Sequence, residues 1–125
     1  MTRPLTDVDI HRLESEKVSR NFGLDFKLLY PWDGMNAPFR GAWCVLRPGD
    51  LSEAHSHDQD EIVICMTGRG ILLTEGEKID MNAGDIVFLK AGNEHAMTNE
   101  LTEDFSYYSI WWNQGMATDY LDAAE

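Results

Sequence analysis

The chain has 125 residues, a net charge of −12, and 43% hydrophobic and 10% aromatic residues. This length and composition favour one folded domain and exclude an intrinsically disordered chain. The acidic charge argues against binding to nucleic acid or to anionic membrane surfaces, because both need clustered cations. No apolar run has the length of a membrane span, and the N-terminus has no signal-peptide pattern. Cys44 and Cys65 lie in apolar strand-like segments and are typical of buried thiols, so we expect a protein of the reducing cytoplasm.

The first 40 residues are expected to form a partly irregular arm that packs on the remaining domain or on a partner subunit. Thr6 or Asp7 is a candidate cap for a short, marginal helix that runs as far as Val18. The segment 22–35 is rich in aromatic and aliphatic side chains, which would favour aggregation if they were exposed. We therefore expect a sheet or a second subunit to cover this segment.

Residues 41–125 are expected to form the main domain, which ends in a short acidic tail at 118–125. The pattern indicates short β-strands separated by glycine-containing turns, with no long helix. Such a succession is typical of an all-β sandwich or barrel. The expected strands span residues 41–47, 51–57, 61–67, 70–75, 77–81, 85–90, 95–99 and 104–112.

Four potential metal ligands lie in two separate segments of the main domain. His55 and His57 are two residues apart, so an extended strand presents both rings on one face. Glu61 follows a polar stretch in which a turn can bring its carboxylate to the same point. His95 must arrive from a distant strand through folding. Three neutral imidazoles and one carboxylate suit a divalent first-row metal.

The spacing around these four residues resembles both motifs of the cupin superfamily. The first motif comprises Gly49, His55, His57, Glu61 and Gly68, separated by five, one, three and six residues. The second motif comprises Gly84, Gly92, His95 and Asn99, separated by seven, two and three residues. One departure is visible, because Lys90 stands where the second motif usually holds a proline. That proline shapes a turn and donates no ligand.

The resemblance covers roughly residues 41–112 and implies a small jelly-roll barrel, also called a double-stranded β-helix. It also implies that His55, His57, Glu61 and His95 converge as metal ligands in the barrel mouth. Zinc and iron(II) are the metals that we expect first, followed by manganese and nickel. Glu61 is in addition a candidate catalytic residue, since four protein ligands fill a tetrahedral zinc site unless one of them swings away. Many cupins dimerise, so we expect a homodimer.

Further residues are candidates for binding a substrate. Strand parity directs Cys65 inward together with Glu61, and Met97 inward together with His95. Aromatic rings can form pocket walls, and an arginine can bind a carboxylate. For each aromatic ring, packing in the core is the alternative role. Packing is also the alternative for Cys65, because Cys65 and Cys44 are both expected to be buried thiols. The alternative for the arginine is a solvated charge on the surface. The candidates are Trp43, Arg47, Cys65, Met97, Tyr107 and Trp111.

The resemblance implies a metal-dependent enzyme that acts on a small molecule, such as a dioxygenase, an isomerase, a decarboxylase or a cyclase. A less specific resemblance is to zinc cupins that work with methionyl-tRNA-synthetase-like domains to join two nitrogens into a hydrazine. That resemblance implies association with a synthetase-like enzyme. The alternative is a ligand-binding or sensing module without chemistry, although sensing cupins usually carry a helix-turn-helix, which this sequence lacks. Metal storage is disfavoured, because such a site would lie in an exposed barrel mouth.

Overall fold

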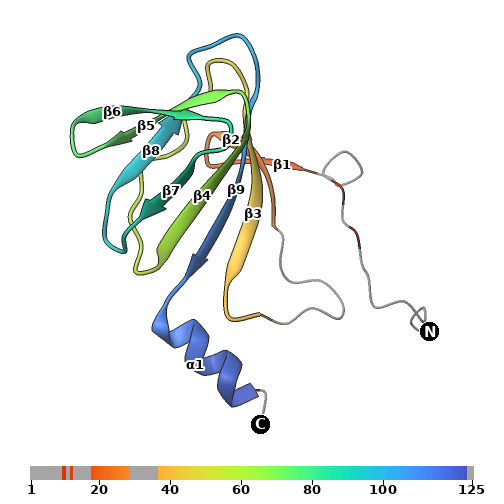
Figure 1. The fold of residues 1–125 in the computed structure, drawn as a ribbon, viewed down its shortest axis with the longest axis vertical. Helices are drawn as coiled ribbons and strands as arrows, with labels where there is room; N and C mark the ends of the chain where they lie inside the picture. The colour runs from red at the N-terminus through yellow and green to blue at the C-terminus, as the bar shows by residue number, and fades with distance from the viewer. Residues whose placement is uncertain (1–9, 11, 13–17, 29–36, 124–125) are drawn as a thin grey trace.

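Two antiparallel sheets build this protein (Figure 1). The structure is a computed structural model that describes residues 10, 12, 18–28 and 37–123. The six-stranded sheet has the order β1-β2-β3-β9-β4-β7, and the three-stranded sheet has the order β6-β5-β8. The strands are β1 (Ser19–Asn21), β2 (Leu24–Leu28), β3 (Arg40–Leu46), β4 (Asp60–Thr67), β5 (Arg69–Thr74), β6 (Glu77–Asn82), β7 (Ile86–Leu89), β8 (His95–Thr98) and β9 (Phe105–Trp112). This architecture confirms the predicted all-β jelly roll.

Seven of the eight predicted strands are present as β3 to β9, with ends that differ from the prediction by one residue or less. The strand predicted over 51–57 is wrong. This segment makes only isolated bridges, from Leu51 to Thr98 and from His55 to His95. Its backbone bonds go to two different partners, because Ser52 N–H donates to Met97 while Glu53 N–H donates to Phe22. A continuous ladder with one neighbour therefore does not form.

The side chains of β4 alternate between the two faces of the strand, and those on the inner face belong to the core between the two sheets. Val63 and Cys65 are buried, whereas Ile62 and Ile64 are partly exposed on the outer face, as the strand parity predicts. Both cysteines are free and buried. The buried cluster comprises Leu24, Ala42, Cys44, Leu46, Val63, Cys65, Leu72, Met81, Leu89, Met97, Phe105 and Tyr107.

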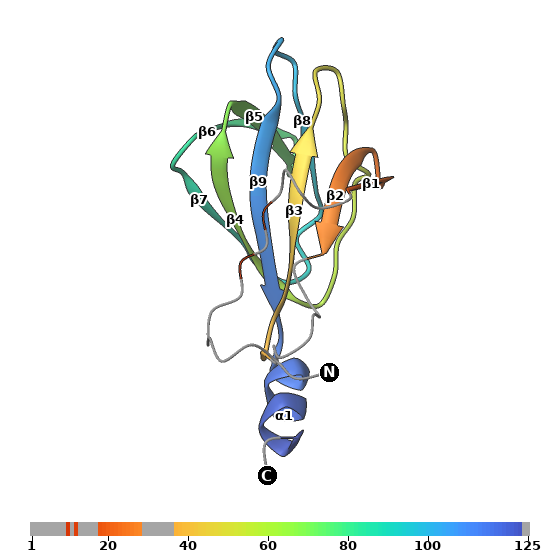
Figure 2. The same ribbon diagram turned by 90° about the vertical axis from the view of Figure 1, so that its right-hand side faces the viewer.

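The described part of the N-terminal arm contributes two strands to the larger sheet. β2 pairs with β3 along four residues, and β1 pairs with β2 at the sheet edge (Figure 2). Ion pairs attach this hairpin to the following segment, since Arg20 contacts Asp50 and the Arg47 Nε lies 3.0 Å from Asp25. Residues 22–28 of the apolar segment are thus part of the sheet. The predicted helix before Val18 and residues 29–35 lie largely outside the described residues.

The predicted acidic tail is in fact mostly helical, which corrects the prediction. α1 (Gln114–Ala123) follows β9 and extends beyond the sheets along the long axis of the molecule (Figure 2). Asn113 caps it, because its Oδ1 accepts a hydrogen bond of 2.8 Å from the N–H of Met116. None of the residues in α1 is buried. Within the described residues, no helix combines the length and apolar character that crossing a membrane requires.

Asn99, the last residue of the second motif, is fully buried and binds three main-chain groups. Its amide nitrogen donates to the carbonyls of Leu46 and Glu103, and its oxygen accepts from the N–H of Leu101. Asn99→Ala leaves these groups without partners, so we expect it to lower the free energy of unfolding by about 3 kcal/mol. Asn82→Ala, at an exposed position, is the control in the same urea titration. A loss at Asn99 no larger than that at Asn82 would contradict this role.

Candidate metal centre

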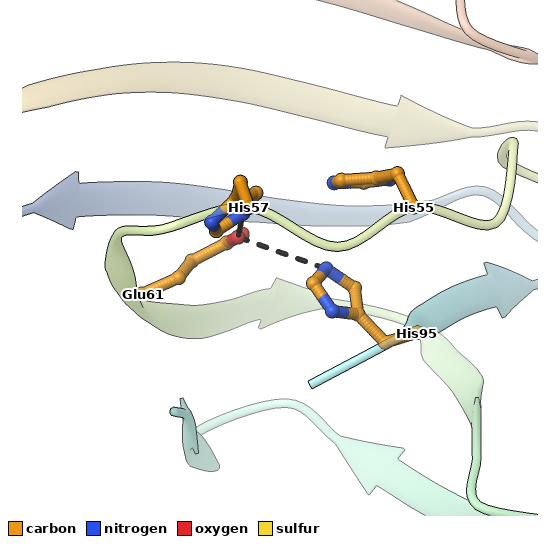
Figure 3. A group of neighbouring side chains, drawn as sticks. All are labelled: His55, His57, Glu61 and His95. Atoms are coloured by element: carbon orange, nitrogen blue, oxygen red, sulfur yellow. Dashed lines mark hydrogen bonds and ion pairs between the residues drawn. The ribbon is translucent and has the colours of Figure 1, made fainter. Parts of the chain in front are cut away.

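Four side chains from three parts of the fold converge on one point (Figure 3). His55 and His57 come from the segment between β3 and β4, Glu61 from the start of β4, and His95 from the start of β8. One ligand atom of each residue lies within 4.8 Å of the others. Three nitrogens and one carboxylate oxygen at this separation surround a space in which they can share a divalent metal.

Main-chain hydrogen bonds bring the two sequence motifs together. His55 and His95 form an isolated bridge, with N–H···O distances of 3.1 and 3.0 Å. The N–H of Gly92 also donates to the carbonyl of His57 at 2.8 Å. The turn before His95 closes without the usual proline, because the N–H of Asn93 donates to the carbonyl of Lys90 at 3.0 Å. Lys90, which stands in the place of that proline, therefore does not prevent His95 from reaching the other three side chains.

Each imidazole is oriented by a main-chain carbonyl two residues away. The Nδ1 atoms of His55, His57 and His95 lie 3.0, 2.9 and 3.1 Å from the carbonyl oxygens of residues 53, 59 and 93. A neutral imidazole that donates its Nδ1–H to a carbonyl presents the lone pair of its Nε2 atom. This arrangement is typical of histidines that ligate metals, because it fixes both the tautomer and the ring orientation.

The carboxylate of Glu61 is held from one side and faces the imidazoles with the other. Ser109 donates its hydroxyl hydrogen to Glu61 Oε2. Glu61 Oε1 lies 3.1 Å from His57 Nε2 and 3.7 Å from His95 Nε2. When the Nδ1 atoms carry the protons, these nitrogens and this oxygen are all acceptors. Hydrogen-bond acceptors this close to one another need a cation between them, which is either a proton or a metal ion. The lone pairs of these nitrogen and oxygen atoms therefore fit a metal ion.

Burial differs among the four residues and keeps one side of the centre open. His95 is only 3% exposed and Glu61 is buried, whereas His57 is half-buried and His55 is exposed. Burial lowers the pKa of His95 below its ordinary value, against the opposing effect of the Glu61 charge. The His95 ring is therefore neutral at neutral pH, which is the form that binds metal.

The centre lies in the wall of a cavity of about 400 Å³. All four residues line this cavity, together with side chains from β2, β3, β8 and β9. Small-molecule sites commonly have this volume and combine apolar walls with a few polar groups. A ligand in the cavity can therefore reach the point where the four side chains meet.

The structure brings three of the six predicted substrate-binding residues to the cavity wall and not the other three. Met97, Tyr107 and Trp111 line it. Trp43 lies on the opposite face of β3 from the cavity-lining Ala42 and Cys44, with its ring 5.9 Å from that of Tyr108. Arg47 is exposed and pairs with Asp25 and Asp104.

Cys65 is 1% exposed and is not part of the cavity wall. Burial raises the pKa of its thiol to about 11, so the sulfur stays protonated at neutral pH. A role of Cys65 in core packing therefore accounts for its position.

Several residues of the site carry no signal of their role in the motifs of the sequence. Ser109 is the inward-facing polar residue between Tyr107 and Trp111 on β9, and this parity was the signal that could have identified it. The hairpin of β1 and β2 contributes Phe22, Leu24 and Phe26 to the cavity wall. No spacing in the sequence relates these residues to the motifs, because the hairpin reaches the cavity through pairing with β3 and through the hydrogen bond from Glu53 N–H to the Phe22 carbonyl.

Comparison with known proteins gives one family and similar solved structures. Residues 42–111 match the cupin domain family. A Cupin 2 conserved barrel domain protein from Salinispora arenicola is 36% identical, with a TM-score of 0.88 over 94% of this chain and 99% of that chain. The plu4264 protein from Photorhabdus luminescens is 31% identical, with a TM-score of 0.86 over 96% of this chain and 98% of that chain.

A curated relative from Thermotoga maritima is named an oxalate-binding protein. It is 27% identical over 66 residues, which are 52% of this chain and 54% of the relative. The match thus spans about half of that relative's length.

The hydrogen bond from Ser109 to Glu61 can be tested through metal affinity. Ser109→Ala frees the carboxylate to rotate, so we expect metal affinity to fall by about tenfold while the fold is retained. Ser106→Ala, on the same strand but on its opposite face, is the matched control. Competition with a chromophoric chelator measures both variants, and equal affinities for the two would contradict the orienting role of Ser109.

Proposed function

Because the chain belongs to the cupin family, we propose that it holds one divalent transition metal and uses it as an enzyme that acts on a small molecule. The ligands are His55, His57, Glu61 and His95. The observation that carries this proposal is the approach of Glu61 Oε1 to within 3.1 Å of His57 Nε2, inside a ring of three oriented imidazoles. That arrangement is stabilised by a cation, and the donor atoms suit a first-row metal.

A bound metal ion supplies Lewis-acid chemistry, since it polarises an oxygen or nitrogen of a bound substrate. The chain's own residues position that substrate. Burial raises the pKa of Tyr107 well above its ordinary value, so its phenol stays protonated in the cavity wall. The phenol interacts with the Cys44 thiol, and it can donate a hydrogen bond to a substrate oxygen when it turns from that sulfur. Glu61 can act catalytically if it leaves the metal, because its second oxygen keeps the bond from Ser109.

The metal decides between two reaction classes. Zinc would supply Lewis-acid chemistry, and the resemblance to hydrazine-forming zinc cupins then implies a rearrangement that joins two nitrogens, with a synthetase-like enzyme as partner. Iron(II) would instead support dioxygenase-type chemistry. Manganese and nickel are compatible with the same ligands. The open side of the centre at His55 supports chemistry of either class, because structural metal sites are closed by their ligands.

A binding protein without chemistry is the second candidate function. It is supported by the name of the curated relative, an oxalate-binding protein, across the half of its length that matches. The cavity favours an enzyme over a binder, since metal centres in concave pockets are the usual place for catalysis.

Metal content tests the proposed function. We expect the wild-type chain, purified without added metal, to contain about one zinc or iron per chain, and His57→Ala and His95→Ala to lose it. His11→Ala is the matched control, because His11 is the one histidine outside both motifs. Elemental analysis by mass spectrometry gives the answer. A wild-type chain that stays empty after incubation with each metal, or variants that keep full occupancy, would contradict the proposal.

We also propose a homodimer that covers the outer face of the larger sheet. Ile86 and Phe88 on β7 are 67% and 59% exposed, and they pair with the outward-facing Ile64 and Ile62 on β4. An exposed apolar strip of this kind favours association. We expect Ile86→Lys to convert a dimer into a monomer in light scattering, whereas Ile79→Lys on β6 does not. A wild-type monomer at high concentration would contradict this proposal.

A further inference from the structure

An aromatic residue occupies a turn position that favours asparagine or glycine. Phe22 and Gly23 alone connect β1 to β2, and their φ angles are 55° and 86°. Two-residue hairpin turns with positive φ at both positions prefer Asn-Gly, because side chains other than Asn, Asp and Gly are strained there. The local requirements of the turn therefore do not explain a phenylalanine at position 22.

The tip of this hairpin is fixed against the segment that carries the first two histidines. A Cβ atom on Gly23 would lie 2.1 Å from the carbonyl oxygen of Leu51, so only glycine fits there. The carbonyl of Phe22 accepts a hydrogen bond of 2.9 Å from the N–H of Glu53. The Glu53 carbonyl in turn lies 3.0 Å from His55 Nδ1. Phe22 is thus held at a defined place relative to the metal centre.

The side chain of Phe22 lies where the cavity meets solvent. It lines the cavity, yet it is 56% exposed. Its ring centroid lies 5.6 Å from that of Phe26, which is also part of the cavity wall. Two adjacent rings at a cavity edge offer faces and edges on which a flat apolar group can pack.

The wall of the cavity has a polar part and an apolar part. The metal ligands form the polar part, with Ser52, Glu53, Gln59 and Ser109 as the other polar residues. Among the described residues that line the cavity, none is a lysine or an arginine. A second anionic group beyond the metal would therefore find no opposite charge and would face acidic residues. The apolar part is formed by Phe22, Leu24, Phe26, Ala42, Cys44, Met97, Tyr107 and Trp111.

The geometry points to a substrate class: a small molecule with one metal-binding polar group and an uncharged, flat apolar body, with Phe22 as a specificity-determining residue that contacts this body. This inference rests on the metal centre of the proposed function. Oxalate does not fit the class, because it offers metal-binding groups alone and leaves the apolar wall uncovered.

Hydroxamic acids test the substrate class, since the same metal-chelating group can carry different bodies. The probes are acetohydroxamic acid, benzohydroxamic acid and 4-carboxybenzohydroxamic acid, titrated into the metal-loaded full chain by calorimetry. We expect benzohydroxamic acid to bind about tenfold more tightly than acetohydroxamic acid, because its ring is removed from water. The added carboxylate should abolish this gain, because it meets no cation.

Phe22→Asn tests the role of the turn residue. Asparagine suits the positive φ better, so we expect the melting temperature to stay the same or rise. The preference for benzohydroxamic acid over acetohydroxamic acid should fall severalfold, while metal content and the affinity for acetohydroxamic acid stay unchanged. Ile79→Asn is the control, because Ile79 is 42% exposed on β6, outside both the cavity wall and the proposed dimer face.

The outcomes separate this inference from the proposed function. A wild-type chain that binds no metal overturns both. A metal-loaded chain that binds the first two probes with equal affinity overturns the substrate class alone. A Phe22→Asn variant with an unchanged preference, or with lower metal content and equal losses for both probes, overturns the role of Phe22.

Discussion

The main-chain bridge between His55 and His95 joins the two halves of the ligand set. Its two hydrogen bonds, of 3.1 and 3.0 Å, connect a segment that is not itself a strand to the first residue of β8. Because each side chain leaves its own backbone beside this bridge, the two imidazoles come within 4.6 Å between ring centroids. His57 and Glu61 follow within six residues of His55. The position of the centre therefore depends on this bridge, together with the hydrogen bond from Gly92 N–H to the His57 carbonyl.

A second layer of contacts determines what the centre can bind. Three carbonyls fix the rings through Nδ1, and Ser109 holds one oxygen of Glu61, so the remaining lone pairs point to a common space. These contacts already restrict the rotation of the side chains, so less conformational entropy is lost when a ligand binds. The same segment contacts the hairpin tip at Phe22. The metal centre and the apolar wall of the cavity are thus parts of one connected structure.

The sequence was sufficient to predict seven strands and the convergence of His55, His57, Glu61 and His95, because these depend on local alternation or on motif spacing. β4 illustrates the first case, since Glu61, Val63 and Cys65 alternate with outward-facing residues. It was insufficient for Trp43, because β3 is buried on both faces and its composition therefore does not reveal which side faces the cavity. The pairing of Cys44 with Tyr107 and of Trp43 with Tyr108 decides this, and register comes only from the folded sheet.

Other features escaped prediction because long-range contacts override local preference. The segment 51–57 was predicted to be a strand, but its hydrogen bonds are divided between β8 and the hairpin tip. The hairpin of β1 and β2 lacked a turn signal, since Phe22 replaces the favoured asparagine. Arg47 is held by Asp25 and Asp104, and Asp25 lies in that same hairpin.

X-ray absorption spectroscopy of the metal-loaded protein shows directly whether the four side chains share one ion. We expect a first shell of three imidazole nitrogens and at least one oxygen at roughly 2 Å from the metal. His11→Ala, whose histidine lies outside both motifs, should give the same shell. A wild-type shell of oxygens without imidazole would contradict the account, because the ion would then lie away from the four converging side chains.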